Sequence, residues 1–179
     1  MSLLILIFIG VNNCYWITIF NVTYLEGNKF VNGIILGMAE LASGIFCGFL
    51  ISYTSPKTAF QLCAVVGIVF NAITLFAAPV GSVLSYVTLF IAILGVGGIY
   101  TAINILIFSI TPKEQVGGAM VFIITIGTSA SLFAPLVVVN EAPIPFLTLA
   151  AMMALAFICS CLLPDGKDED QERVEAELE

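Results

Sequence analysis

Glu40 is the residue best placed to do chemistry in this sequence. It is a carboxylate near the middle of the apolar run NGIILGMAELASGIFCGFLI, residues 32–51. Placing a carboxylate at the centre of a bilayer costs about 2.5–3.5 kcal/mol on insertion scales, so we expect Glu40 to face a protein interior or a water-filled cavity. Two roles are open for it: binding a substrate cation or a proton, or a structural bond to neighbouring Asn, Ser or Thr side chains.

Polar and aromatic residues also interrupt most of the other apolar segments. Hydrogen bonds between membrane helices would account for any one of them, whereas polar groups in four or five segments together favour the lining of a cavity. The residues predicted to bind a substrate or line that cavity are Glu40, Asn12, Tyr15, Trp16, Tyr100, Asn104 and Thr128.

Other kinds of site find little support in the sequence. The chain has no histidine, and its five cysteines all lie in apolar stretches, which favours lipid-facing or core thiols over a disulfide framework. There are no carboxylates paired for acid–base catalysis, no phosphate-binding glycine loop after a strand and no basic patch. We therefore expect neither an enzyme nor a nucleic-acid-binding protein, and no cofactor or metal.

The elements that carry these residues are predicted to be membrane-spanning helices. Of the 179 residues, 60% are hydrophobic and 9% are charged, against about 25% charged in an average soluble domain. A span needs roughly 20 mostly apolar residues, and six segments meet that length. They are predicted at about 2–23, 31–53, 59–78, 83–110, 117–139 and 143–163. The fold class is therefore all-α, a polytopic membrane protein with six transmembrane helices.

Small residues and proline predict local features within these helices. Gly33 and Gly37, and again Gly44 and Gly48, are spaced four apart, as in helices that approach another backbone closely. The sequence GVGG, residues 95–98, predicts a weak point in the long fourth segment. Gly127, Ser131 and Pro135 recur every four residues in the fifth segment and predict a kink there.

The distribution of charge divides the chain into two parts and orients it. Residues 1–164 carry three lysines and four glutamates, whereas residues 165–179 carry eight acids and two bases. We expect a six-helix domain over 1–164 and a disordered acidic tail over 165–179. Four of the five Lys and Arg residues fall on the side of the two termini, which predicts both termini in the cytoplasm, or in the matrix of a mitochondrion.

Several motifs occur in order along the hydrophobic region: GNKFVNGIILGMAEL at residues 27–41, LFAPLV at 132–137 and CLLPDGKDED at 161–170, with CYW at 14–16 in the first segment. They resemble the C-terminal half of major facilitator transporters of the organic cation, anion and carnitine branch. The first motif resembles the start of the family's eighth helix, where members read Gly-Asn-x-Tyr-x-Asn, a later Gly and then Val-Glu-x-Pro. Glu40 stands at the place of that carboxylate, and Ala42 stands where the Pro would be.

The resemblance implies a substrate site near the midplane between two six-helix halves related as parallel repeats. It also implies that Glu40 belongs to the charge and hydrogen-bond apparatus of the second half. Asn12, Tyr15 and Trp16 would lie on a helix bordering the central cavity.

The sequence departs from the family's pattern at its gate charges. Lys57 is the only charge in the loop that is basic in the family. Of the family's signature after the tenth helix, only the proline, Pro112, is present here. Ser109 stands in place of the signature's Glu, and Val116 and Thr128 stand where the family has Arg. The ion pairs that close the family's cytoplasmic gate are therefore not expected here.

Two functions follow as hypotheses. The first is transport of small organic ions together with a second six-helix half, supplied by a homodimer or by a separate N-terminal half. The second is a non-transporting structural subunit of a larger membrane complex. The retained Glu40 favours the first, and the lost gate charges favour the second.

Overall fold

The computed structural model describes residues 2–24, 28–76, 83–112, 114–139 and 144–163. The described residues form helices: α1 (Ser2–Tyr24), α2 (Lys29–Tyr53), α3 (Pro56–Phe76), α4 (Val83–Ile110), α5 (Val116–Ala130), η1 (Ser131–Phe133), α6 (Ala134–Val138) and α7 (Ile144–Cys161). The predicted tail, residues 165–179, lies outside the described residues.

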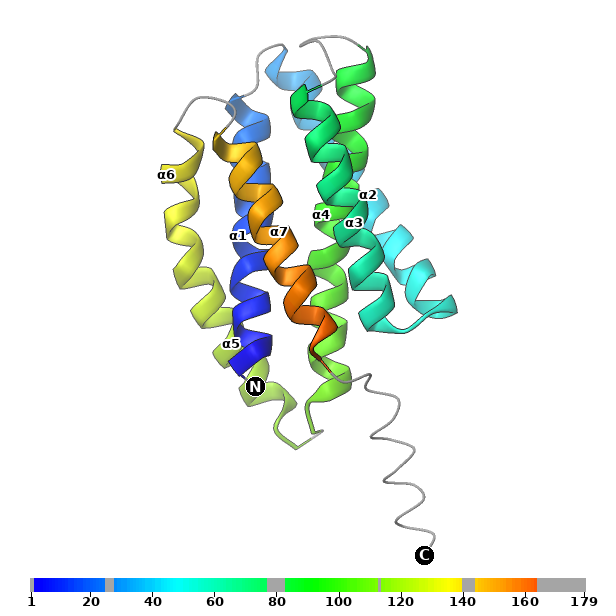
Figure 1. The fold of residues 1–179 in the computed structure, drawn as a ribbon, viewed down its shortest axis with the longest axis vertical. Helices are drawn as coiled ribbons and strands as arrows, with labels where there is room; N and C mark the ends of the chain where they lie inside the picture. The colour runs from blue at the N-terminus through cyan, green and yellow to red at the C-terminus, as the bar shows by residue number, and fades with distance from the viewer. Residues whose placement is uncertain (1, 25–27, 77–82, 113, 140–143, 164–179) are drawn as a thin grey trace, which may run out of the picture.

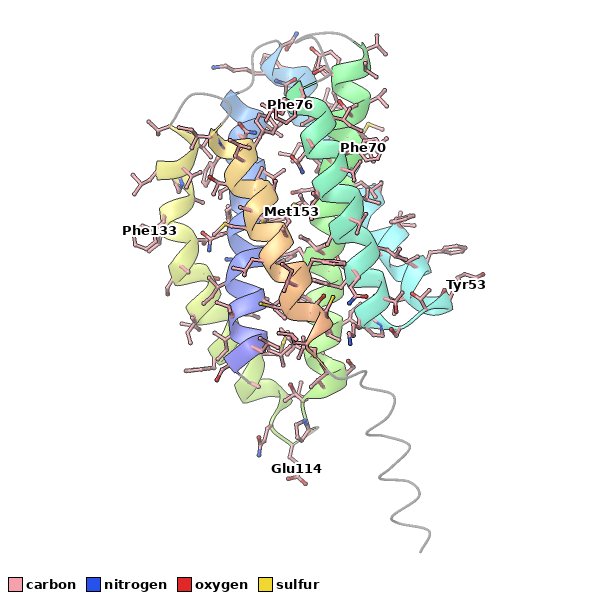
Figure 2. All side chains as sticks on the ribbon, in the orientation of Figure 1. Tyr53, Phe70, Phe76, Glu114, Phe133 and Met153 are labelled. Carbon is pink, nitrogen blue, oxygen red and sulfur yellow. The ribbon has the colours of Figure 1, made fainter. Side chains whose placement is uncertain are left out.

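Six helical segments are long and apolar enough to cross a membrane, with α5, η1 and α6 counting together as one. The predicted all-α fold with six spans is therefore confirmed, and the chain is an integral membrane protein. Large apolar side chains cover its outer surface. Tyr53 and Phe133, for example, project outward from opposite sides of the bundle (Figure 2), as expected of residues that meet lipid.

Local capping explains where α2 and α3 begin before the predicted positions. The side chain of Asn28 accepts a hydrogen bond from the Phe30 amide at 2.9 Å, so α2 begins at Lys29. Ser55 Oγ accepts from the Thr58 amide at 3.2 Å, and Pro56 occupies the first helical position of α3, where its missing N–H has no effect. Both signals are present in the sequence, within segments interpreted as loops.

The helices form two groups of three. In one, α4 packs on α2 and α3; in the other, α1 packs on α5, α6 and α7. Figure 1 shows α5 and α6 at one edge of the bundle and α2 at the opposite edge. The groups meet where α1 contacts α4 and α3 contacts α7. The two groups have the same pattern of contacts. The main helix–helix contacts are reproduced when α1 is exchanged with α4, α2 with α5–α6, and α3 with α7, as expected for a pseudo-two-fold relation.

Three glycines of α4 form the centre of the first group. A Cβ on Gly95 would lie 2.6 Å from the Gly67 nitrogen of α3, and one on Gly97 would lie 2.3 Å from Ser43 Oγ of α2. A Cβ on Gly98 would meet the Cys63 side chain. The GVGG sequence therefore brings α2 and α3 close to α4, and α4 runs through it as one continuous helix.

The fifth span changes from an α-helix to a 3₁₀ turn near the predicted kink. The α-helical pattern gives way to the 3₁₀ turn η1 at Ser131–Phe133, immediately before α6 and its Pro135. Proline has no N–H to donate to the carbonyl four residues earlier, which here belongs to Ser131. In the preceding turn, Phe8 of α1 occupies the space that a side chain on Gly127 would need.

The glycines of α2 contact no other helix among the described residues. Nothing lies within 4 Å of a Cβ built on Gly33, Gly37, Gly44 or Gly48. Their spacing indicated a packing face, but no helix of the described chain occupies it.

Candidate functional site

The candidate site lies where α1, α2 and α4 meet, near the middle of each helix. Tyr15 Oη of α1 donates a hydrogen bond to Glu40 Oε1 of α2 at 2.9 Å. The Tyr15 ring also stacks on the Tyr100 ring of α4, with centroids 4.6 Å apart and planes inclined by 20°. All three side chains are partly buried, so the carboxylate is neither enclosed in the core nor fully exposed.

Glu40 is held in place by its own helix as well as by Tyr15. Ser43 Oγ donates to the Glu40 backbone carbonyl at 2.7 Å, and Ser43 is the residue that fits against Gly97 of α4. The turn of α2 that follows Glu40 is therefore packed directly on the turn of α4 that precedes Tyr100.

Further aromatic rings extend this group along α1. Trp16 meets Tyr15 edge to face at 5.9 Å, and Phe20 stacks on Trp16 at 6.0 Å. Phe8 lies 6.4 Å from the Tyr100 ring. Such rings present faces of negative potential, which attract positive charge, and Tyr15 connects this group of rings to the Glu40 carboxylate.

Lysine and arginine are scarce among the described residues. The described cations are Lys29 and Lys57, which lie in the first turns of α2 and α3. Glu40 is the one described carboxylate within a membrane-spanning helix, since Glu114 lies between α4 and α5 at the end of the bundle (Figure 2). The described residues therefore place one acidic group, and no basic group, near the middle of a spanning helix.

Asn12 and Thr128, two of the predicted site residues, are not brought to this cluster. Asn12 is 2% exposed, and its Nδ2 donates to the Gly127 carbonyl at 2.9 Å, which joins α1 to α5. Thr128 is exposed on α5, and the described part of α5 makes no contact with α2.

Asn104 lies one turn beyond Tyr100 on α4 and is partly buried. Its Nδ2 donates to the Tyr100 carbonyl at 2.6 Å. The structure therefore brings Glu40, Tyr15, Trp16 and Tyr100 together, with Asn104 next to them.

Phe8 and Phe20 belong to the cluster, although the sequence analysis did not select them. A signal existed for both. Phe8 precedes Tyr15 by seven residues and Phe20 follows Trp16 by four, and these spacings place side chains on one face of a helix. In an apolar segment the same spacing is usual for core residues, so it did not distinguish them.

In comparisons with protein-family models and with curated proteins, nothing matches this chain. Its function is therefore inferred from the arrangement of its own residues.

Proposed function

We propose that this chain is the C-terminal six-helix half of a major facilitator-type transporter of small organic ions, in the organic cation, anion and carnitine branch. It works with a second six-helix half, in an integral membrane complex whose substrate reaches Glu40. The observation that carries the proposal is the Glu40 carboxylate, partly buried at mid-helix and hydrogen-bonded to Tyr15, whose ring in turn contacts Tyr100 and Trp16.

The chemistry of this cluster favours a cation over an anion as the transported ion. A carboxylate supplies the opposite charge, and tyrosine and tryptophan faces attract ammonium groups at distances up to about 6 Å. An anion would meet the carboxylate with no described lysine or arginine to offset it beyond the first turns of α2 and α3. A small organic ammonium ion is therefore the substrate class that fits.

The arrangement of the helices supports the assignment to a transporter half. The six-helix halves of major facilitator proteins contain two inverted three-helix repeats. Here the contacts among the helices are largely preserved when α1, α2 and α3 are exchanged with α4, α5–α6 and α7, and three spans per repeat would invert the second repeat relative to the first. Glu40, Tyr15 and Tyr100 lie where the two groups meet.

Uptake measurements on the complex extracted from its own membrane and reconstituted into vesicles test the function. Tetraethylammonium is the cationic probe and benzoate the anionic one. We expect uptake of the cation, and a loss of at least tenfold in Glu40→Gln, because glutamine keeps the shape and hydrogen-bonding capacity but removes the charge. Tetraethylammonium uptake unaffected by Glu40→Gln would sink the proposal. Glu114→Gln is the matched control, since Glu114 lies outside the spans, and its uptake should be unchanged.

A structural subunit is the second candidate, and the position of Lys57 favours it. Lys57 is the one charge left in the loop that is basic in the resembled family, and its Nζ donates to the Leu163 carbonyl at the end of α7. A lysine used in this way stabilises the helix end.

The mass and composition of the native complex separate the two candidates: a homodimer or a pair of six-helix chains fits transport, whereas a large assembly of unrelated subunits fits the structural role.

A further inference from the structure

We propose that Tyr100 is a positioning residue, which holds the Tyr15 hydroxyl on the Glu40 carboxylate through the stack of the two rings. This inference rests on the proposed function and deepens it. It assigns Tyr100 a task distinct from contact with the substrate.

The Tyr15 side chain packs against the buried core and makes two ring contacts. Helices α1 and α2 touch only sparsely, whereas α4 packs closely on α2. The ring of Tyr15 is contacted by Trp16, its neighbour on the same helix, at 5.9 Å, and by Tyr100 from α4 at 4.6 Å. Of these two contacts, only the stack with Tyr100 ties the plane of the Tyr15 ring to another helix.

Tyr100 is well placed to act as a fixed support. Gly97 and Gly98 lie three and two residues before it on α4, and they pack against Ser43 of α2 and Cys63 of α3. Because Ser43 also bonds the Glu40 backbone at 2.7 Å, Glu40 and Tyr100 belong to one closely packed unit. Phe8 of α1 lies 6.4 Å from the Tyr100 ring and gives it a second aromatic neighbour.

This geometry makes the effect of Tyr100 depend on the Tyr15 hydroxyl. If Tyr100 orients Tyr15, its loss matters only while Tyr15 has a hydroxyl to orient. If Tyr100 contacts the cation itself, its loss matters whether or not that hydroxyl is present. A double-mutant cycle on Tyr15→Phe and Tyr100→Leu separates these cases.

The binding experiment uses the complex extracted from its own membrane and placed in lipid nanodiscs, with radiolabelled tetraethylammonium as the probe. We expect Tyr100→Leu to weaken binding between about two- and tenfold, the range expected for one aromatic stack. It should have no further effect in the Tyr15→Phe background. Tyr100→Phe keeps the ring and should bind within twofold of the unmodified chain. Equal effects of Tyr100→Leu in both backgrounds, or no effect in either, would overturn the inference.

A second measurement makes the test independent of binding. The infrared band of the Glu40 carboxyl group, identified by its loss in Glu40→Gln, reports the hydrogen bond from Tyr15 in the absence of any cation. Tyr100→Leu should shift this band as Tyr15→Phe does, and an unshifted band contradicts the positioning role. If Tyr100→Leu does not fold, Tyr100→Met provides apolar bulk without a planar ring. The two proposals can fail separately. If Tyr100→Leu shifts the band but Glu40→Gln binds the probe as well as the unmodified chain does, the positioning role is supported and only the proposed function is rejected.

Discussion

Asn12 and Glu40 are both polar residues inside a membrane protein, and the structure uses them differently. Asn12 is buried and bonds a backbone carbonyl of another helix, so its polarity is satisfied in the core. Glu40 is partly buried and shares its carboxylate with one tyrosine. The residue type alone does not separate a structural polar group from a candidate binding group. The burial of the side chain and the identity of its hydrogen-bond partner do.

We expect Asn12→Leu to weaken the attachment of α1 to α5 modestly. Hydrogen bonds between membrane helices contribute about 0.6 kcal/mol on average and about 1.7 kcal/mol at most, and leucine is close to asparagine in volume. The free energy of unfolding in mixed detergent micelles should fall by an amount in this range. The matched control is Asn13→Leu, because Asn13 is also buried but donates to the Ile9 carbonyl of its own helix at 2.9 Å. A loss as large in Asn13→Leu as in Asn12→Leu would contradict the interpretation.

At the scale of the helices, glycine has two different environments in this chain. Gly67, Gly95, Gly97, Gly98 and Gly127 each lie against a neighbouring helix. The four glycines of α2 have open space where a side chain would be. Neither the residue type nor the four-residue spacing in α2 therefore says which glycines contact another helix until the neighbouring helices are known.

This difference predicts opposite effects of one substitution. Gly95→Ala would place a Cβ 2.6 Å from the backbone of Gly67, and overpacking of this kind costs about 1–3 kcal/mol. Gly37→Ala meets nothing within 4 Å, and alanine is favoured over glycine in a helix by up to about 1 kcal/mol. Thermal unfolding in detergent should show a lowered midpoint for Gly95→Ala and an unchanged or raised midpoint for Gly37→Ala. A lowered midpoint for both would mean that α2 is covered within the folded chain.

In the whole molecule, the first and the last residues of the helical region lie at the same end of the bundle. Figure 1 shows the start of α1, the residues between α4 and α5 and the end of α7 at the same end, as an even number of spans requires. The start of α2, whose first residue is Lys29, lies at the other end. Combined with the distribution of lysines, this arrangement leads us to propose that the end carrying Glu114 faces the cytoplasm or matrix.

Labelling with a membrane-impermeant maleimide tests this orientation in sealed vesicles of known sidedness. In a Cys161→Ser background, which removes the exposed native thiol, a cysteine at position 29 should react from the outer side. A cysteine at position 114 should react only after the vesicles are opened. The reverse pattern would invert the orientation, and reaction of both from one side would contradict the six-span arrangement.

Much of the fold could be predicted from the sequence, because the class of a membrane protein depends on local properties. A run of about 20 apolar residues forms a helix in lipid, where every backbone group must bond within its own segment. The predicted 83–110 matches α4 at both ends, since Thr111 and Pro112 stop the helix. The errors of two to three residues at the starts of α2 and α3 come from caps interpreted as loop residues.

The candidate site was predictable in part. Glu40, Tyr15, Trp16 and Tyr100 were chosen from the sequence because they are polar or aromatic groups in apolar helices, and they lie together in the structure. Asn12 was chosen for the same reason, but it bonds to α5, and Thr128 lies on a helix that does not touch α2.

Composition and spacing along one helix determined that this is a six-span membrane protein with a carboxylate at mid-span. Which side chain meets that carboxylate, and which glycines are covered, was decided only by the tertiary structure, because these contacts join segments whose separation in sequence carries no information about their distance in space.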